Sequence, residues 1–229
     1  MIKDDIVLLQ ALLFWGAFFV SVAGASNQEN IRKLALVNNE LAFKIYRKLI
    51  EDTSKNMFFS PLSISSVFSM LYYGSEGDTA KELKKTLGYE DAGITDELLH
   101  ETFSSFLKNL LRAGRFPNGT VIQSTNAVVA NKSIDLTPEF RLKIKEWYEA
   151  SVREVDFTKD ADAIVGGVND WIKNQTHGKI NTLITELNPA VLMILLNAMY
   201  FKGAWKIPFD QDKTSPQLFF NNGRESEKK

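Results

Sequence analysis

The sequence contains no cysteine and only two histidines, His100 and His177. Without a thiol, disulfide frameworks, cysteine nucleophiles, zinc fingers and cysteine-ligated iron–sulfur clusters are all excluded. The 229 residues carry almost no net charge, because 27 of them are Lys or Arg and 28 are Asp or Glu. Binding to nucleic acid is therefore not expected, because it requires basic side chains over a whole face of the protein.

Motifs of the common enzyme classes are also missing. The sequence has no Gly-x-Ser-x-Gly, no glycine-rich phosphate loop and no His-Glu-x-x-His. A catalytic triad is also not expected, because the sequence has only two histidines and they lie on separate segments. The stretch Ser105-Phe-Leu-Lys108 matches Ser-x-x-Lys, but we interpret it as a surface coincidence on a helix. The sequence therefore predicts a protein that is not an enzyme and that holds no metal or cofactor.

An apolar stretch, IVLLQALLFWGAFFVSV, occupies residues 6–22 and is followed by Ala23-Gly24-Ala25. Small residues at this place are typical of a signal-peptidase site, so we interpret residues 1–25 as a secretory signal and residues 26–229 as the mature chain. A membrane anchor is the alternative, because about 17 apolar residues are just enough to span a bilayer. Removal of the signal would leave a chain with no membrane contact.

Three glycosylation sequons, at Asn118, Asn131 and Asn174, agree with a secretory route. Such triplets also occur by chance in chains that never enter this route. Together, the signal and the sequons predict a secreted, extracellular glycoprotein.

Apolar residues at spacings of three and four predict a helix over residues 30–50, NIRKLALVNNELAFKIYRKLI. Phe43, Tyr46 and Ile50 widen its apolar stripe, so we expect this helix to be well buried. A second helix begins at Ser60-Pro61, a typical N-cap and first-turn pair, and ends at Gly74. Its expected buried residues are Ile64, Val67, Phe68 and Leu71.

Further along, Thr79-Ala-Lys-Glu82 has the form of a capping box and Thr137-Pro138 that of a helix start. Apolar spacing indicates two more helices, one through Leu99, Phe103, Phe106 and Leu110 and one over residues 164–172. Runs of apolar and β-branched residues at 121–130, 153–157 and 190–201 predict strands. We expect the last strand to be buried on both faces, with a neighbour on each edge. This mixed order of helices and strands predicts an α+β fold.

Near the end of the sequence, Leu218-Phe-Phe precedes Asn222-Gly223, a strong two-residue hairpin signal. Only Arg-Glu-Ser-Glu-Lys-Lys follows. We therefore expect the returning strand to be missing and the sequence to stop within a fold.

A basic strip of Lys108, Arg112 and Arg115 follows the helix that contains Phe103. It offers a contact for a heparin-like sulfated polysaccharide, and a solvated helix face is the alternative interpretation. His177 follows the helix over residues 164–172, where we interpret it as a structural residue near the last carbonyl groups.

Three separated motifs occur in a characteristic order. Residues 56–65, NMFFSPLSIS, are followed by residues 71–83, LYYGSEGDTAKEL; residues 168–172, VNDWI, by residues 176–180, THGKI; and residues 196–205, LNAMYFKGAW, by Phe209 and Thr214. In this order they resemble the second and third helices, the sixth helix with its exit, and the third strand of the main sheet in the serpin family of serine protease inhibitors. The resemblance covers residues from about 30 to 229 and only a little over the first half of a complete serpin.

The resemblance implies a metastable fold in which a serine protease cuts an exposed reactive-centre loop. The cut loop then inserts as a new strand into the main sheet and traps the acyl-enzyme. By position, Ser60, Ser63 and Asn197 match the family's shutter, the polar cluster beneath the strands that must part, and Trp205 matches the breach, where insertion begins. Two hydroxyls at a helix start and one buried amide are groups that can satisfy one another's hydrogen bonds.

Other parts of the family pattern have no counterpart in the sequence. These are the shutter's histidine, the strands that flank the inserted loop, the hinge and the reactive-centre loop, so no reactive site can be named. Two alternatives to inhibition therefore stay open, a non-inhibitory serpin-fold binding or carrier protein and an inactive truncated fragment.

Overall fold

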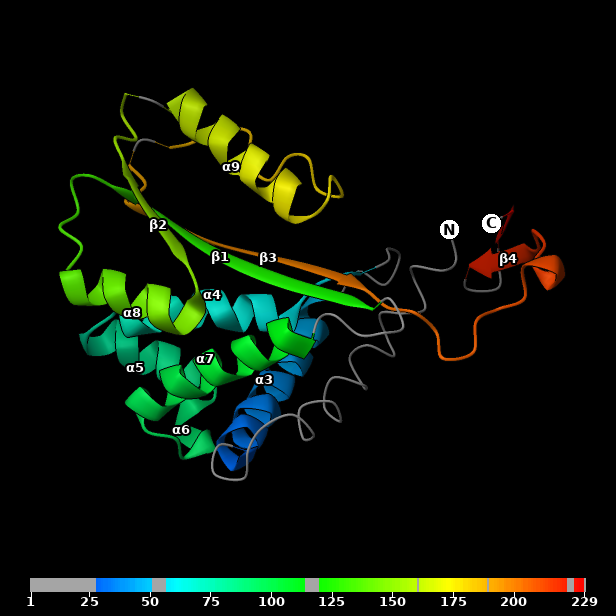
Figure 1. The fold of residues 1–229 in the computed structure, drawn as a ribbon, viewed down its shortest axis with the longest axis horizontal. Helices are drawn as coiled ribbons and strands as arrows, with labels where there is room; N and C mark the ends of the chain where they lie inside the picture. Colours follow the sequence, from blue (N-terminus) through cyan, green and yellow to red (C-terminus); the bar gives the residue numbers. More distant parts are fainter. Residues whose placement is uncertain are drawn as a thin grey trace.

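The computed structural model describes residues 28–50, 57–113, 120–159, 161–188, 190–221 and 225–228, without the side chains of residues 111–113 and 219–228. The signal predicted at residues 1–25 lies outside them. A three-stranded sheet divides the described chain into two layers (Figure 1). Six helices cover one face of the sheet and a single helix, α9, crosses the other. No helix among the described residues is long and apolar enough to cross a membrane.

The sheet consists of β1 (Val121–Asn131), β2 (Ser151–Val155) and β3 (Met193–Lys202) in the order β2-β1-β3. β1 pairs with β2 in parallel and with β3 antiparallel along almost its whole length. The three predicted strands are thus confirmed, although β2 begins two residues early. The prediction that β3 has a neighbour on each edge is wrong for the described residues, which pair only its β1 edge.

The helices on the first face come from residues 28–148. They are α3 (Gln28–Leu49), α4 (Pro61–Tyr73), α5 (Gly77–Thr86), α6 (Tyr89–Ala92), α7 (Asp96–Ala113) and α8 (Pro138–Tyr148), and α9 (Ala161–Gln175) lies opposite. Ser60 and Thr137 cap their helices as predicted, each accepting a backbone N–H before a proline start. The capping box at Thr79 is wrong, because α5 begins at Gly77 with Glu76 as the N-cap.

Two apolar cores lie on the two faces of the sheet, and β1 contributes to both. Val128 and Ala130 point into the larger core beneath α3–α8, while Ala127 and Val129 point into the smaller core beneath α9. Since successive side chains of a strand alternate between faces, a strand covered on both faces is apolar without alternation. This explains why the second half of β1, residues 127–130, is apolar at every position.

The buried face of α4 differs from the prediction. Ser65, Ser66 and Ser69 are buried, whereas Phe68 is 41% exposed and Ile64 is half-buried. Neighbouring helices bond two of these hydroxyl groups, Ser65 to Asn38 of α3 and Ser69 to Tyr89 of α6, whereas Ser66 Oγ has no hydrogen-bond partner among the described residues.

The expectation of a well-buried first helix is also wrong in part. Phe43 is 58% exposed and Tyr46 is 39% exposed on α3. The buried stripe of this helix is narrower, and consists of Ile31, Leu34, Ala35, Val37, Leu41 and Ala42.

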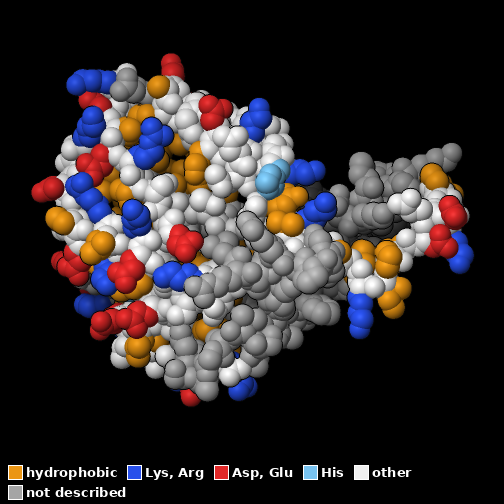
Figure 2. Space-filling model, viewed as in Figure 1, with side chains coloured by type: hydrophobic (Ala, Val, Ile, Leu, Met, Phe, Trp, Pro, Cys, Tyr) orange, Lys and Arg blue, Asp and Glu red, His pale blue; other side chains and the backbone are white. Residues whose placement is uncertain are grey.

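At the end of the chain, β4 (Leu218–Asn221) pairs antiparallel with β5 (Glu225–Lys228). The prediction that the returning strand is missing is therefore wrong, because four charged and polar residues form it. A short 3-10 helix, η1 (Gln211–Lys213), precedes this hairpin. Figure 2 shows that acidic and basic side chains alternate over the helical part of the surface.

Candidate functional site

The start of α4 lies against β3 through two hydroxyl groups. Ser60 Oγ accepts hydrogen bonds from the backbone N–H of Ser63 at 3.2 Å and from Ser63 Oγ at 2.9 Å. Ser60 Oγ in turn donates to the sulfur of Met199 on β3, at 3.5 Å. The structure thus brings Ser60 and Ser63 together as the sequence predicts, and it places them directly under the sheet.

The third predicted member of this cluster, Asn197, does not reach the serines. Its Nδ2 donates to Asn126 Oδ1 at 2.8 Å and to Ser124 Oγ at 3.2 Å, both on the neighbouring strand β1. Met199, two residues further along the same face of β3, takes the place beside Ser60 instead. Asn197 Oδ1 is buried and has no hydrogen-bond partner among the described residues.

Asn126 is a buried residue of this cluster that the sequence analysis missed. It is 2% exposed, and its Nδ2 donates to the carbonyl of Tyr148 at 2.7 Å. Asn126 thereby connects Asn197 of β3 to the end of α8. A polar residue inside the run VIQSTNAVVA was the available signal, since a buried amide in a strand must find partners.

A second buried polar group lies between α7 and α8. The imidazole of His100 is 3% exposed, its Nδ1 is 2.6 Å from the hydroxyl of Tyr148, and its ring stacks on Trp147 with 5.1 Å between centroids. Burial lowers the pKa of His100 to about 4, against a smaller opposing effect from the charge of Asp96. Burial also raises the pKa of the Tyr148 hydroxyl well above its ordinary value. This cluster packs α7 against α8.

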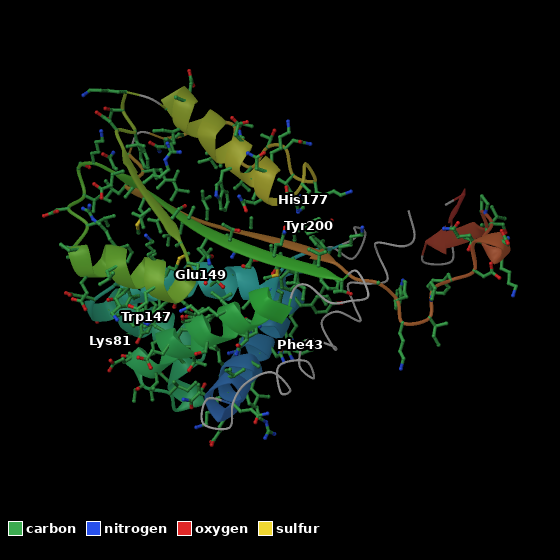
Figure 3. The ribbon with its side chains drawn as sticks, viewed as in Figure 1. Phe43, Lys81, Trp147, Glu149, His177 and Tyr200 are labelled. Carbon is green, nitrogen blue, oxygen red and sulfur yellow. The ribbon has the colours of Figure 1, made fainter. Side chains whose placement is uncertain are left out.

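The other histidine fastens α9 to the outer face of the sheet. His177 has a left-handed backbone with φ of 51°, and its Nε2 is 2.8 Å from Gln123 Oε1 on β1. Its ring meets the ring of Tyr200 on β3 edge-on, with 4.5 Å between centroids (Figure 3). Gln175 Oε1 accepts from Thr125 Oγ1 at 3.0 Å. The end of α9 therefore contacts both β1 and β3.

Trp205, the predicted breach residue, follows the end of β3. It is half-buried, and its ring packs edge-on against Phe209 with 5.8 Å between centroids. The backbone N–H of Ala204 donates to Thr120 Oγ1 at 3.2 Å. This bond holds the segment after β3 beside the start of β1.

The predicted sequons differ in accessibility. Asn131 is 8% exposed at the end of β1, and its Oδ1 accepts from the backbone N–H of Ser133 at 3.0 Å. Asn174 is exposed on α9. Asn118 lies outside the described residues.

The predicted basic strip is only partly described. Lys108 is half-buried on α7. The side chain of Arg112 and the whole of Arg115 lie outside the described residues.

The chain is similar to proteins of one known family. It matches the model of the family described as serpin (serine protease inhibitor) over residues 36–229. Iripin-3 of Ixodes ricinus is 33% identical over 206 residues, which cover 90% of this chain and 52% of that protein. Serpin B8 of Homo sapiens is 33% identical over 193 residues, which cover 82% of this chain and 50% of that protein. The chain thus spans about half the length of the curated relatives that it matches.

Solved structures give the same result. A structure of cleaved kallistatin complexed with heparin superposes with a TM-score of 0.79 at 29% identity, over 86% of this chain and 57% of that one. Ovalbumin from emu, Dromaius novaehollandiae, superposes with a TM-score of 0.79 at 24% identity over 85% of this chain and 53% of that one, and it supports the fold alone. These matches agree with the α+β fold and the three motifs, and the chain belongs to the serpin family.

Proposed function

We propose that this chain is part of a serpin that inhibits a serine endopeptidase by inserting its cleaved reactive loop as a new strand beside β3. The match to the serpin family over residues 36–229 carries the proposal, and the second edge of β3 is the place where the inserted strand would add. This edge has no partner strand among the described residues, and it belongs to a ten-residue strand in the middle of the fold. An unpaired edge presents a row of backbone donors and acceptors to which an extended segment can add.

The polar cluster supports this proposal by its position. The hydrogen bond between Asn197 and Asn126 joins β3 to β1 on one edge of β3. A new strand can therefore add to the other edge of β3 while β1 and β3 stay paired. The unpartnered Oδ1 of Asn197 is an acceptor for a donor brought by the rest of the fold, because a buried polar atom without a partner is costly. Ser60 and Ser63 offer hydroxyl groups beneath the same strand.

We also propose that the protein is secreted and that Ser60, Ser63 and Asn197 act as the shutter and Trp205 as part of the breach. The apolar stretch at residues 6–22 and the three sequons support secretion. The intact mass of the protein recovered from culture medium after deglycosylation tests both the route and the cleavage after residue 25. A heparin-like polysaccharide is proposed as a second partner, since a related serpin, kallistatin, has been solved with heparin bound.

Inhibition is tested by incubating the protein, as its own cells secrete it, with trypsin-like, chymotrypsin-like and elastase-like serine proteases. The expected result is a complex of the combined mass that survives denaturing electrophoresis, because the acyl-enzyme is covalent. The matched control is the same protease with its nucleophilic serine replaced by alanine, which cannot form the complex. Cleavage without any complex would favour the non-inhibitory binding protein, and neither cleavage nor complex would favour an inactive fragment.

A further inference from the structure

The contact between α4 and β3 contains a thioether that accepts a hydrogen bond. Ser63 Oγ donates to Ser60 Oγ at 2.9 Å, and Ser60 Oγ donates to the sulfur of Met199 at 3.5 Å. The two hydroxyl groups therefore form a short chain that ends at the sulfur. α4 packs directly beneath the sheet at this place (Figure 1). The last bond of the chain is weak, because a thioether sulfur is a poor acceptor.

The side chain of Met199 is only half-buried, although it packs against the larger apolar core. A small solute can therefore reach it. Met70 of α4 differs in this respect, because it is 0% exposed.

Met193 provides a close comparison for Met199 on the same strand. The two residues are an even number of positions apart, so their side chains project from the same face of β3. Both are half-buried and both pack against the larger core. The contacts of the described residues give the sulfur of Met193 no hydrogen-bond donor, whereas Met199 has the hydroxyl of Ser60. The two methionines therefore differ in the polar group beside the sulfur.

A hydroxyl group beside a thioether matters when hydrogen peroxide oxidises the sulfur. A lone pair of the sulfur forms the new S–O bond while the O–O bond of the peroxide breaks. The departing hydroxide takes the proton of the transferred hydroxyl group and leaves as water, so the sulfur loses two electrons and the peroxide gains them. The product, methionine sulfoxide, is polar and chiral. Its oxygen is costly in an apolar core unless a donor bonds it.

We propose that Met199 is a site of oxidation by peroxide, at which the hydroxyl of Ser60 stabilises the sulfoxide. This hydroxyl already points at the sulfur, so it can bond the negative charge that develops on the incoming oxygen. Oxidation then replaces a weak hydrogen bond between α4 and β3 by a stronger one. The same oxygen on Met193 would have no such donor. The consequence for the shutter rests on the proposed function, whereas the oxidation site itself does not.

The test treats the full-length protein with limiting hydrogen peroxide and measures the oxidation of each methionine by peptide mass spectrometry, with no protease inhibition involved. In the folded protein Met199 should be oxidised at least about fivefold faster than Met193, the factor that one net hydrogen bond supplies. In urea the two rates should become equal. The variant Ser60→Gly removes the hydroxyl but remains an acceptable N-cap, so it should abolish the difference. Ser60→Thr keeps a hydroxyl group and should keep the difference.

A second measurement needs no variant. Because Ser60 lies on one side of the sulfur, one of the two sulfoxide epimers should prevail at Met199. After the oxidised protein has been unfolded, one of the two stereospecific methionine sulfoxide reductases should therefore remove most of this sulfoxide. The inference is overturned if Met199 and Met193 are oxidised at equal rates in the folded wild type, if Ser60→Gly keeps the difference, or if the two epimers at Met199 are equally abundant.

Discussion

Lowering the pH from about 8 to about 4.5 should destabilise the fold through His100. The folded protein keeps this imidazole neutral until its pKa of about 4, because the ring is buried between Trp147 and Tyr148. In the unfolded chain the same ring binds a proton from about pH 6.5 downwards. The unfolded state therefore binds more protons in this range, and stability falls as the pH falls.

The size of the effect follows from the two pKa values. A separation of about 2.5 units corresponds to about 3.4 kcal/mol when the change is complete, and to about 2.5 kcal/mol at about pH 4.5. The stability contributed by neutral His100 is fully present above about pH 6.5 and is lost progressively down to about pH 4. A loss of this size is a large part of the total stability of a typical domain.

Urea unfolding followed by tryptophan fluorescence measures the effect, since Trp147 stacks on His100. We expect the midpoint to fall by about 1 M urea between the two pH values. The variant His100→Gln should lose most of this pH dependence, whereas the control His177→Gln should keep it, because that histidine is exposed. An unchanged midpoint in the wild type, or equal pH dependence in His100→Gln, would refute the reasoning.

Two further predictions concern the sheet and the sequons. Asn126→Ala should lower the free energy of unfolding at neutral pH by about 3 kcal/mol, because the buried carbonyl of Tyr148 loses the amide that bonds it and Asn197 Nδ2 loses one of its two acceptors. A loss below about 1 kcal/mol in urea unfolding would contradict this. In protein made through the secretory route, Asn174→Gln should reduce the intact mass by one glycan and Asn131→Gln should not, because Asn174 is exposed and Asn131 is buried. The reverse pattern would show that burial does not decide occupancy.

Much of the secondary structure could be predicted from local sequence. The caps at Ser60 and Thr137 are confirmed because a side-chain acceptor followed by proline fixes a helix start with little help from the rest of the fold. The strand β1 is confirmed because Val, Ile and Thr without helical spacing are typical of a strand, and its residues 127–130 are buried on both faces of the sheet.

The interior of α4 and the partners of Asn197 could not be predicted in this way. A hydropathy pattern treats serine as polar and therefore places it on the surface. Ser65 and Ser69 can be buried because Asn38 and Tyr89, from other helices, form hydrogen bonds with them. Asn197 was expected to have partners, but the register between β1 and β3, which sets Asn126 opposite it, is a long-range property. The same holds for His100, whose burial depends on α8.

During synthesis of the chain, β1 leaves the ribosome well before β3, the strand with which it pairs. Between the last residue of β1, Asn131, and the last residue of β3, Lys202, the ribosome must add 71 residues. At about 5–20 residues per second this takes about 4 to 14 s, during which Asn126 and the serines of α4 exist without the strand that they contact. The nascent helical layer therefore exposes the apolar side chains that β3 later covers throughout this interval, and exposed apolar surface makes a nascent chain prone to aggregation.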